Sequence, residues 1–132
     1  MQIVDPIDVE DAARADLADM LAEARCFAPP APDDLAAGDV MVTSLGGPPL
    51  TEVVHEYDLS VDVWGATEAE AAMLAAAAAG AIGALPLLGA HAAWKTARAS
   101  APYINPDPKR PTLPRYTFAA TVAARGSRNK LI

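Results

Sequence analysis

Apolar and polar residues alternate most clearly over residues 51–64. Successive side chains of a strand point to opposite faces, so this alternation predicts a half-buried strand of an antiparallel sheet. A second alternating run, residues 115–125, predicts the last strand in the same way. Shorter runs predict strands over 40–45 and within 91–101. In the 51–64 strand one face carries Tyr57, Leu59, Val61 and Val63, and the other carries Glu56, Asp58, Ser60, Asp62 and Trp64.

Helical periodicity replaces the alternation in two segments. Residues 8–25 begin with Asp8, a suitable N-cap, and residues 67–70 have the pattern of a capping box that opens an alanine-rich helix. The element order is therefore helix, two strands, helix, two strands. It predicts an α+β domain over residues 1–126, with a four-stranded, mainly antiparallel sheet and both helices packed on one face. The first helix has an acidic face, expected to be solvated, of Glu10, Asp11, Asp16, Asp19 and Glu23.

The prolines and the C-terminal residues predict two irregular segments. Residues 102–114 contain five prolines and read as a stiff loop with Lys109 and Arg110 at its tip. Connections of this length in a compact domain are commonly functional or disordered. Residues 127–132 read as a flexible basic tail.

Several features indicate a reducing compartment and no membrane. Cys26 is the only cysteine, so no intramolecular disulfide can form, and the first residues do not resemble a signal peptide. Cys26 ends an acidic helix, which should raise the pKa of its thiol. Residues 71–90 carry no polar side chain. Pro86 shortens their helical part to about 15 residues, or ~22 Å, less than the ~30 Å of a bilayer core. We therefore expect a buried helix.

The charges divide the chain into an acidic half and a basic half. Residues 1–70 contain sixteen acidic and two basic side chains, whereas residues 71–132 contain one acidic and eight basic ones. The halves thus carry −14 and +7, which sum to the net charge of −7. A net acidic protein lacks the basic footprint of a nonspecific nucleic-acid binder. The split indicates two complementary surfaces, through which copies of the chain can contact one another head to tail.

The most conspicuous carboxylates are Glu56, Asp58 and Asp62, on one face of the 51–64 strand. Same-face neighbours on a strand lie about 6.6–7 Å apart. Ligand oxygens sit roughly 2.0–2.6 Å from a calcium or magnesium ion, so this strand alone cannot close such a shell. We expect a solvated or pore-facing acidic row. Arg115 and Arg125 flank the row if the last strand pairs with it.

No pattern of catalytic or zinc-binding residues stands out elsewhere. His55 and His91 have no histidine or cysteine at ligand spacing near them. The Gly46-Gly47 pair does not lead into a helix and has no following lysine, unlike a phosphate-binding loop. We therefore expect no metal, no cofactor and no enzymatic activity.

Three pieces of the sequence together resemble the tail terminator (tail completion) proteins of long-tailed, siphovirus-type bacteriophages. The first is the strand-to-helix unit over residues 57–71, YDLSVDVWGATEAEA. The second is the apolar helix that follows it, and the third is the closing strand over residues 114–125, which begins with proline, arginine and an aromatic residue. The resemblance spans most of residues 8–125. The loop over 102–114 and the connection over 85–90 depart from it.

The resemblance implies a structural virion protein that forms a homohexameric ring at the head-proximal end of the tail tube. Such a ring is assembled in the host cytoplasm, ends tube polymerisation and joins the tail to head-completion or connector proteins. Its partners are copies of itself, the tail tube protein, those connector proteins, and the genome as it passes through the lumen. No catalytic residue transfers, because the family has none. Glu56, Asp58 and Asp62 would line the lumen, and the expected subunit or partner contacts are Trp64, Lys109, Arg110, Arg115 and Arg125.

Other functions stay open at the level of sequence. A head-closure or head–tail joining protein of the neck, or a baseplate-side tail protein, would share the features that indicate assembly. A small-molecule-binding α+β domain belongs to a different class. It would need a concave apolar pocket with converging polar groups, and no such set stands out in the sequence.

Overall fold

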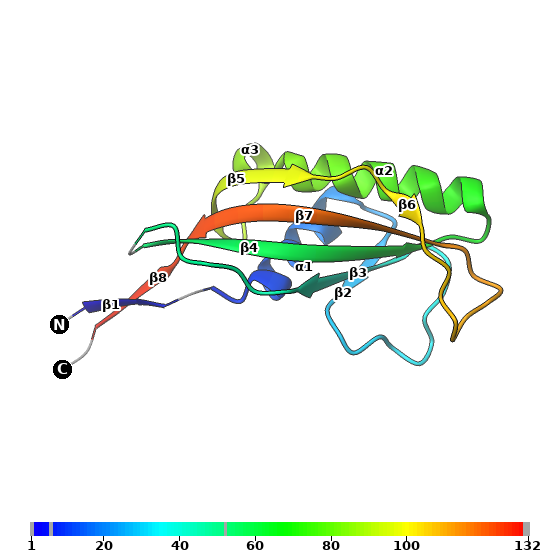
Figure 1. Ribbon diagram of the computed structural model, residues 1–132, viewed down its shortest axis with the longest axis horizontal. Coiled ribbons are helices and arrows are strands. Elements are labelled where there is room, and N and C mark those ends of the chain that lie inside the picture. The colour runs from blue at the N-terminus through cyan, green and yellow to red at the C-terminus, as the bar shows by residue number, and fades with distance from the viewer. Residues whose placement is uncertain (1, 6, 52, 131–132) are drawn as a thin grey trace.

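A six-stranded sheet forms the main layer of this computed structural model, which describes residues 2–5, 7–51 and 53–130. Its strands are β2 (Arg25–Phe27), β3 (Asp39–Ser44), β4 (Val54–Trp64), β5 (Ala93–Ala99), β6 (Tyr103–Ile104) and β7 (Arg115–Arg125). Five of them follow the order β2-β3-β4-β7-β5, and β6 also pairs with β7 (Figure 1). All neighbours are antiparallel except β2, which runs parallel to β3.

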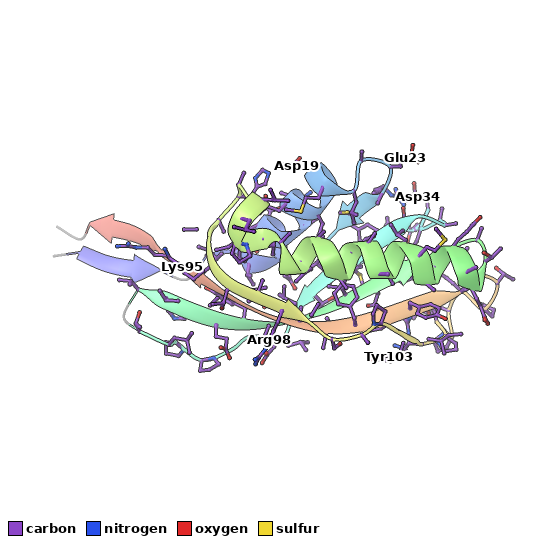
Figure 2. All side chains as sticks on the ribbon, turned by 90° about the horizontal axis from the view of Figure 1, so that it is seen from above. Asp19, Glu23, Asp34, Lys95, Arg98 and Tyr103 are labelled. Atoms are coloured by element: carbon purple, nitrogen blue, oxygen red, sulfur yellow. The ribbon has the colours of Figure 1, made fainter. Side chains whose placement is uncertain are left out.

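Three helices cover one face of this sheet (Figure 2): α1 (Val9–Met20), α2 (Glu68–Gly83) and α3 (Leu85–Leu88). The predicted caps are present. The Asp8 carboxylate accepts the N–H of Asp11 at 3.2 Å, and the Thr67 hydroxyl accepts the N–H of Glu70 at 3.1 Å. No helix among the described residues is both long enough and apolar enough to cross a bilayer.

The core lies between the helices and the inner face of the sheet. The alternation in β4 and β7 buries most of the predicted apolar set and leaves Asp58 exposed on the open face, but Trp64 and Thr117 of the opposite set are buried and Tyr116 is only half-buried. The stripe of α2 that faces the sheet consists mainly of alanines, and such small side chains let a helix lie close to the strands. The inner face carries Val40, Val42, Tyr57, Leu59, Val61, Val63, Phe118, Ala120, Val122 and Ala124.

The prediction of four strands and two helices was correct in class and incomplete in detail. The first helix ends at Met20 rather than near residue 25, because Arg25 belongs to β2. The Arg25 guanidinium donates to Asp39 and to Asp34, at 3.1 Å in each case, which anchors β2 beside β3. The second additional strand, β6, lies within the proline-rich loop and pairs with the start of β7. The third helix, α3, follows α2 and carries Pro86 in its first turn.

A separate two-stranded ribbon joins the beginning and the end of the described chain. Strand β1 (Gln2–Asp5) pairs antiparallel with β8 (Ser127–Lys130), and the ribbon projects from one end of the main sheet (Figure 1). The sequence predicts a flexible tail over residues 127–132 and no strand at either end. Residues 127–130 form β8, whereas residues 131 and 132 lie outside the described part of the chain.

Candidate assembly surfaces

The acidic row lies on the open face of the sheet, away from the helices. Strand pairing places Asp58 opposite Thr121 and Asp62 opposite Thr117. The Thr117 hydroxyl donates to Asp62 at 2.6 Å, and the Thr121 hydroxyl donates to Asp58 at 3.1 Å. The hydroxyl of Thr117 also accepts a hydrogen bond from the Asn105 amide at 3.1 Å. The threonines of β7 therefore fix two of the carboxylates that the sequence singled out.

The two predicted flanking arginines lie at opposite ends of the row. Arg115 pairs in register with Trp64, at the end of β4, and Arg125 pairs with Val54, at its beginning. Arg125 is exposed, and the third carboxylate of the row, that of Glu56, is partly buried. The open face of β4 is thus acidic along its middle and bordered by positive charge at both ends.

Trp64 is buried beneath the proline-rich loop and is 1% exposed. Its indole N–H donates to Asp107 at 3.2 Å, and the guanidinium of Arg115 lies 5.9 Å from the centroid of the indole ring, a cation–π arrangement. Arg115 also donates to the backbone carbonyl of Asn105 at 2.7 Å. Because its own chain covers it, Trp64 is not available to a second subunit in this conformation.

Asp107 holds the loop in this position. It accepts the backbone N–H of Lys109 at 3.0 Å and a guanidinium N–H of Arg110 at 3.2 Å, in addition to the indole of Trp64. Burial opposes the ionisation of Asp107, but these three hydrogen bonds and the nearby charge of Arg115 outweigh it and lower the pKa of the carboxyl below its ordinary value. Among the predicted contact residues, Lys109 and Arg125 are the ones whose side chains stay exposed.

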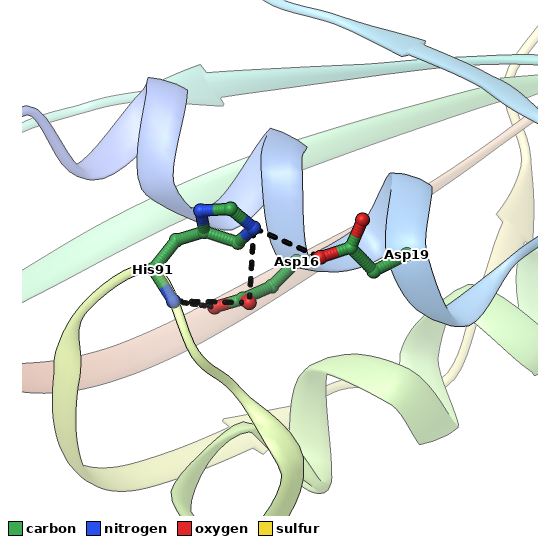
Figure 3. Close-up of side chains that lie close together, drawn as sticks. All are labelled: Asp16, Asp19 and His91. Atoms are coloured by element: carbon green, nitrogen blue, oxygen red, sulfur yellow. Dashed lines mark hydrogen bonds and ion pairs between the residues drawn. The ribbon is translucent and has the colours of Figure 1, made fainter.

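The structure also assembles Asp16, Asp19 and His91, which the sequence analysis did not connect (Figure 3). His91 Nε2 lies 2.8 Å from Asp19 Oδ2 and 3.9 Å from Asp16 Oδ1. Asp16 is 1% exposed, so the prediction of a solvated position for it was wrong. Its carboxylate accepts the N–H of Ala90 at 2.8 Å, that of His91 at 3.2 Å and the indole N–H of Trp94 at 2.7 Å. This carboxylate therefore ties α1 to the turn before β5.

Cys26 lies in β2 and is buried. Burial raises the pKa of its thiol to about 11, the nearby Asp39 adds to the effect, and Arg14 opposes it. The sequence predicted the direction but attributed it to a helix end. The helix stops at Met20, so desolvation takes the place of the helix dipole as the cause.

Two oppositely charged surfaces of the folded chain are the β5 edge and the α1 side. From residue 90 to residue 104, along the β5 edge of the sheet, Lys95 and Arg98 are exposed and no acidic residue occurs. Figure 2 shows Arg98 on the side opposite to α1. On the α1 side lie the exposed carboxylates of Asp19, Glu23 and Asp34.

A solved structure gives the comparison with known proteins. A chain in the virion of a native gene transfer agent (GTA) particle has a similar fold, with a TM-score of 0.57 and 18% sequence identity. The match covers 89% of this chain and 95% of that chain. No family model matches the sequence. No curated protein matches it either. At this identity the likeness establishes a shared fold.

Proposed function

We propose that this protein is a structural virion component that forms a ring at the head-proximal end of a phage-type tail tube. The observation that carries the proposal is the fold likeness to a chain of a gene transfer agent virion, which spans nearly the whole of both chains. The sequence resemblance to tail terminator proteins rests on residues 57–71 and 114–125 and points to the same kind of particle. In this role the ring ends tube polymerisation and joins the tail to the head-completion proteins.

The distribution of charge supports a ring. A closed ring is built from heterologous contacts, in which one side of each subunit fits a different side of the next. The basic β5 edge and the acidic α1 side are two such surfaces on one molecule. The open face between them carries the acidic row and is suited to a lumen through which DNA passes, since carboxylates repel phosphate.

The first test is assembly of the purified chain. Mass photometry over a range of protein concentrations should show a ring-sized species at about 50 mM salt and less of it at about 500 mM, where exposed charges are screened. Added to polymerising tail tube protein of the same particle, the ring should cap the tubes and shorten them in electron micrographs. A chain that stays monomeric at low salt and does not assemble with tube protein would refute the proposal. Binding to a head connector but not to the tube would favour a neck protein instead.

The acidic row gives a second prediction. Charge reversal by Glu56→Lys, Asp58→Lys and Asp62→Lys should leave rings visible in electron micrographs but make them retain DNA, with an affinity that falls as salt rises. Particles built with this variant should transfer DNA less efficiently. The matched control replaces the same residues by Gln, Asn and Asn, which preserves size and removes the repulsion without adding attraction. Loss of rings in the lysine variant alone would place the row in a subunit contact.

A further inference from the structure

Strand β5 leaves one edge of the main sheet open. Among the described strands it pairs only with β7, and β6 continues along the same side of β7. Open strand edges expose unpaired backbone groups and readily accept another chain unless charge or a bulge protects them. Here the register shifts between Trp94 and Thr96, and Lys95 lies at the shift. Further along the edge Arg98 is exposed, and Tyr103 (55%) and Ile104 (47%) add apolar surface.

A shallow groove lies on the acidic side of the molecule. It consists of two adjoining hollows, of about 320 and 210 Å³, which share Gly38 and Leu74. Its walls come from α2, from residues 21–24, from residues 37–38 and from residues 64–66. Most of the lining is apolar, and each hollow contains one carboxylate, Glu23 in the larger and Glu70 in the smaller.

The groove and the β5 edge complement each other in chemistry. Lysine and arginine have long aliphatic stems with a charge at the end, so an apolar groove that holds a carboxylate suits them. Lys95 and Arg98 form no ion pair within the described part of the chain, and neither does Glu23. These charges are therefore available to a neighbour. The second carboxylate of the groove, that of Glu70, is also exposed.

The strand directions fit the same contact. Strand β5 is antiparallel to β7, and the pairings across the sheet make β5 run opposite to β2 at the other edge. A second copy in the same orientation therefore presents its β2 edge antiparallel to β5. When the same contact is repeated from copy to copy, a closed ring forms if the rotation between neighbouring copies divides a full turn into equal steps.

From these observations we infer that the β5 edge of one subunit docks on the acidic groove side of the next copy of this chain, with Lys95 and Arg98 facing Glu23 and Glu70. This inference rests on the proposed ring and adds the identity of its subunit contact. The inferred contact differs from the one expected at Arg110 and Arg115. These two side chains already donate hydrogen bonds within their own chain, to Asp107 and to the backbone carbonyl of Asn105. The partner is a second copy because both complementary surfaces belong to the same chain.

A charge-swap experiment tests the contact. The basic-edge variant carries Lys95→Glu and Arg98→Glu, and the acidic-side variant carries Glu23→Lys and Glu70→Lys. Each alone should weaken ring formation in mass photometry at least about tenfold, because two charge pairs become repulsive. An equimolar mixture should recover rings, since alternating subunits restore attraction at every contact. The matched control, Lys95→Arg with Arg98→Lys, keeps a positive charge at the same two sites and should assemble like the wild type.

The outcomes separate the contact from the ring itself. If the wild type forms rings and both swapped variants do so equally well, the inferred contact is wrong and the proposed ring stands. If the swapped variants lose rings and their mixture does not recover them, the pairing between these two surfaces is wrong as well. Loss of rings in the control Lys95→Arg with Arg98→Lys would show that the positive charge of these side chains does not make the contact, which overturns the inference. A wild type that never forms rings overturns both proposals.

Discussion

Replacing Asp16 by alanine should lower the free energy of unfolding by about 2–4 kcal/mol, because it breaks three hydrogen bonds to a buried carboxylate at once. The buried carboxylate of Asp16 accepts hydrogen bonds from the backbone of Ala90 and His91 and from the indole of Trp94. Alanine would leave these donors without an acceptor and would open a cavity between α1 and the turn before β5. The loss is large because an unsatisfied buried donor keeps its full desolvation cost.

Urea denaturation of both proteins, followed by circular dichroism, measures this effect. The control is Asp19→Ala, which removes a carboxylate one helical turn away whose side chain is 69% exposed and contacts only His91. Exposed ion pairs contribute about 0–1 kcal/mol, so this variant should differ little from the wild type. Equal stability losses in the two variants would show that Asp16 does not anchor the turn.

Replacing Asp107 by alanine should destabilise the protein by about 2–4 kcal/mol and release the loop from Trp64. The carboxylate joins Trp64, Arg110 and the backbone of Lys109, so its removal frees all three at once. The indole N–H of Trp64 should then exchange with solvent faster in NMR spectra. Lys109→Ala is the matched control, because it keeps the backbone N–H that Asp107 accepts. Unchanged exchange in the Asp107 variant would contradict this role of the carboxylate.

The same carboxylate predicts a dependence on pH. The folded state lowers the pKa of Asp107, so its contribution to stability is fully present above the unfolded value of about 3.9. That contribution is lost as the pH falls through the lower, folded pKa. The difference in stability between the wild type and Asp107→Asn should therefore be constant from pH 7 to about pH 4 and shrink below it. A difference that persists unchanged into strong acid would show that ionisation of Asp107 is not involved.

The sequence predicts the long strands well because their pattern is local. The period of two in β4 and β7 reflects burial of one face, and Gly65 and Pro114 mark where two of these strands meet loops. Strands β2 and β6 could not be predicted in this way, because runs of three and two residues are too short to show an alternation of apolar and polar residues. They depend on partners elsewhere in the fold, such as the carboxylates that bind Arg25.

The surfaces were predicted less completely than the sheet, because they too depend on contacts between residues far apart in the sequence. The alternation in the sequence predicts the polar face of β4, and Asp58 and Asp62 do lie on it. The burial of Trp64 could not be predicted in this way, because the loop that covers it is held by Asp107, 43 positions away. The sequence predicts a solvated Asp16 because the residue is charged. Its position on α1, however, belongs to the buried stripe beside Ala12 and Ala13. Its hydrogen-bond donors, about 75 residues further on, exist only in the folded chain.

The placement of β7 has a consequence for synthesis. This strand pairs with β4, β5 and β6, yet it follows all three in the sequence and therefore leaves the ribosome after them. Pairings between residues as distant as Tyr57 and Val122 are slow to form, and domains fold as units once their parts are present. Until β7 is made, β4 lacks one neighbour and β5 lacks its sheet partner. A chain that is cut short before residue 115 therefore lacks the strand that holds β5 in the sheet, and with it the surface on which the inferred subunit contact depends.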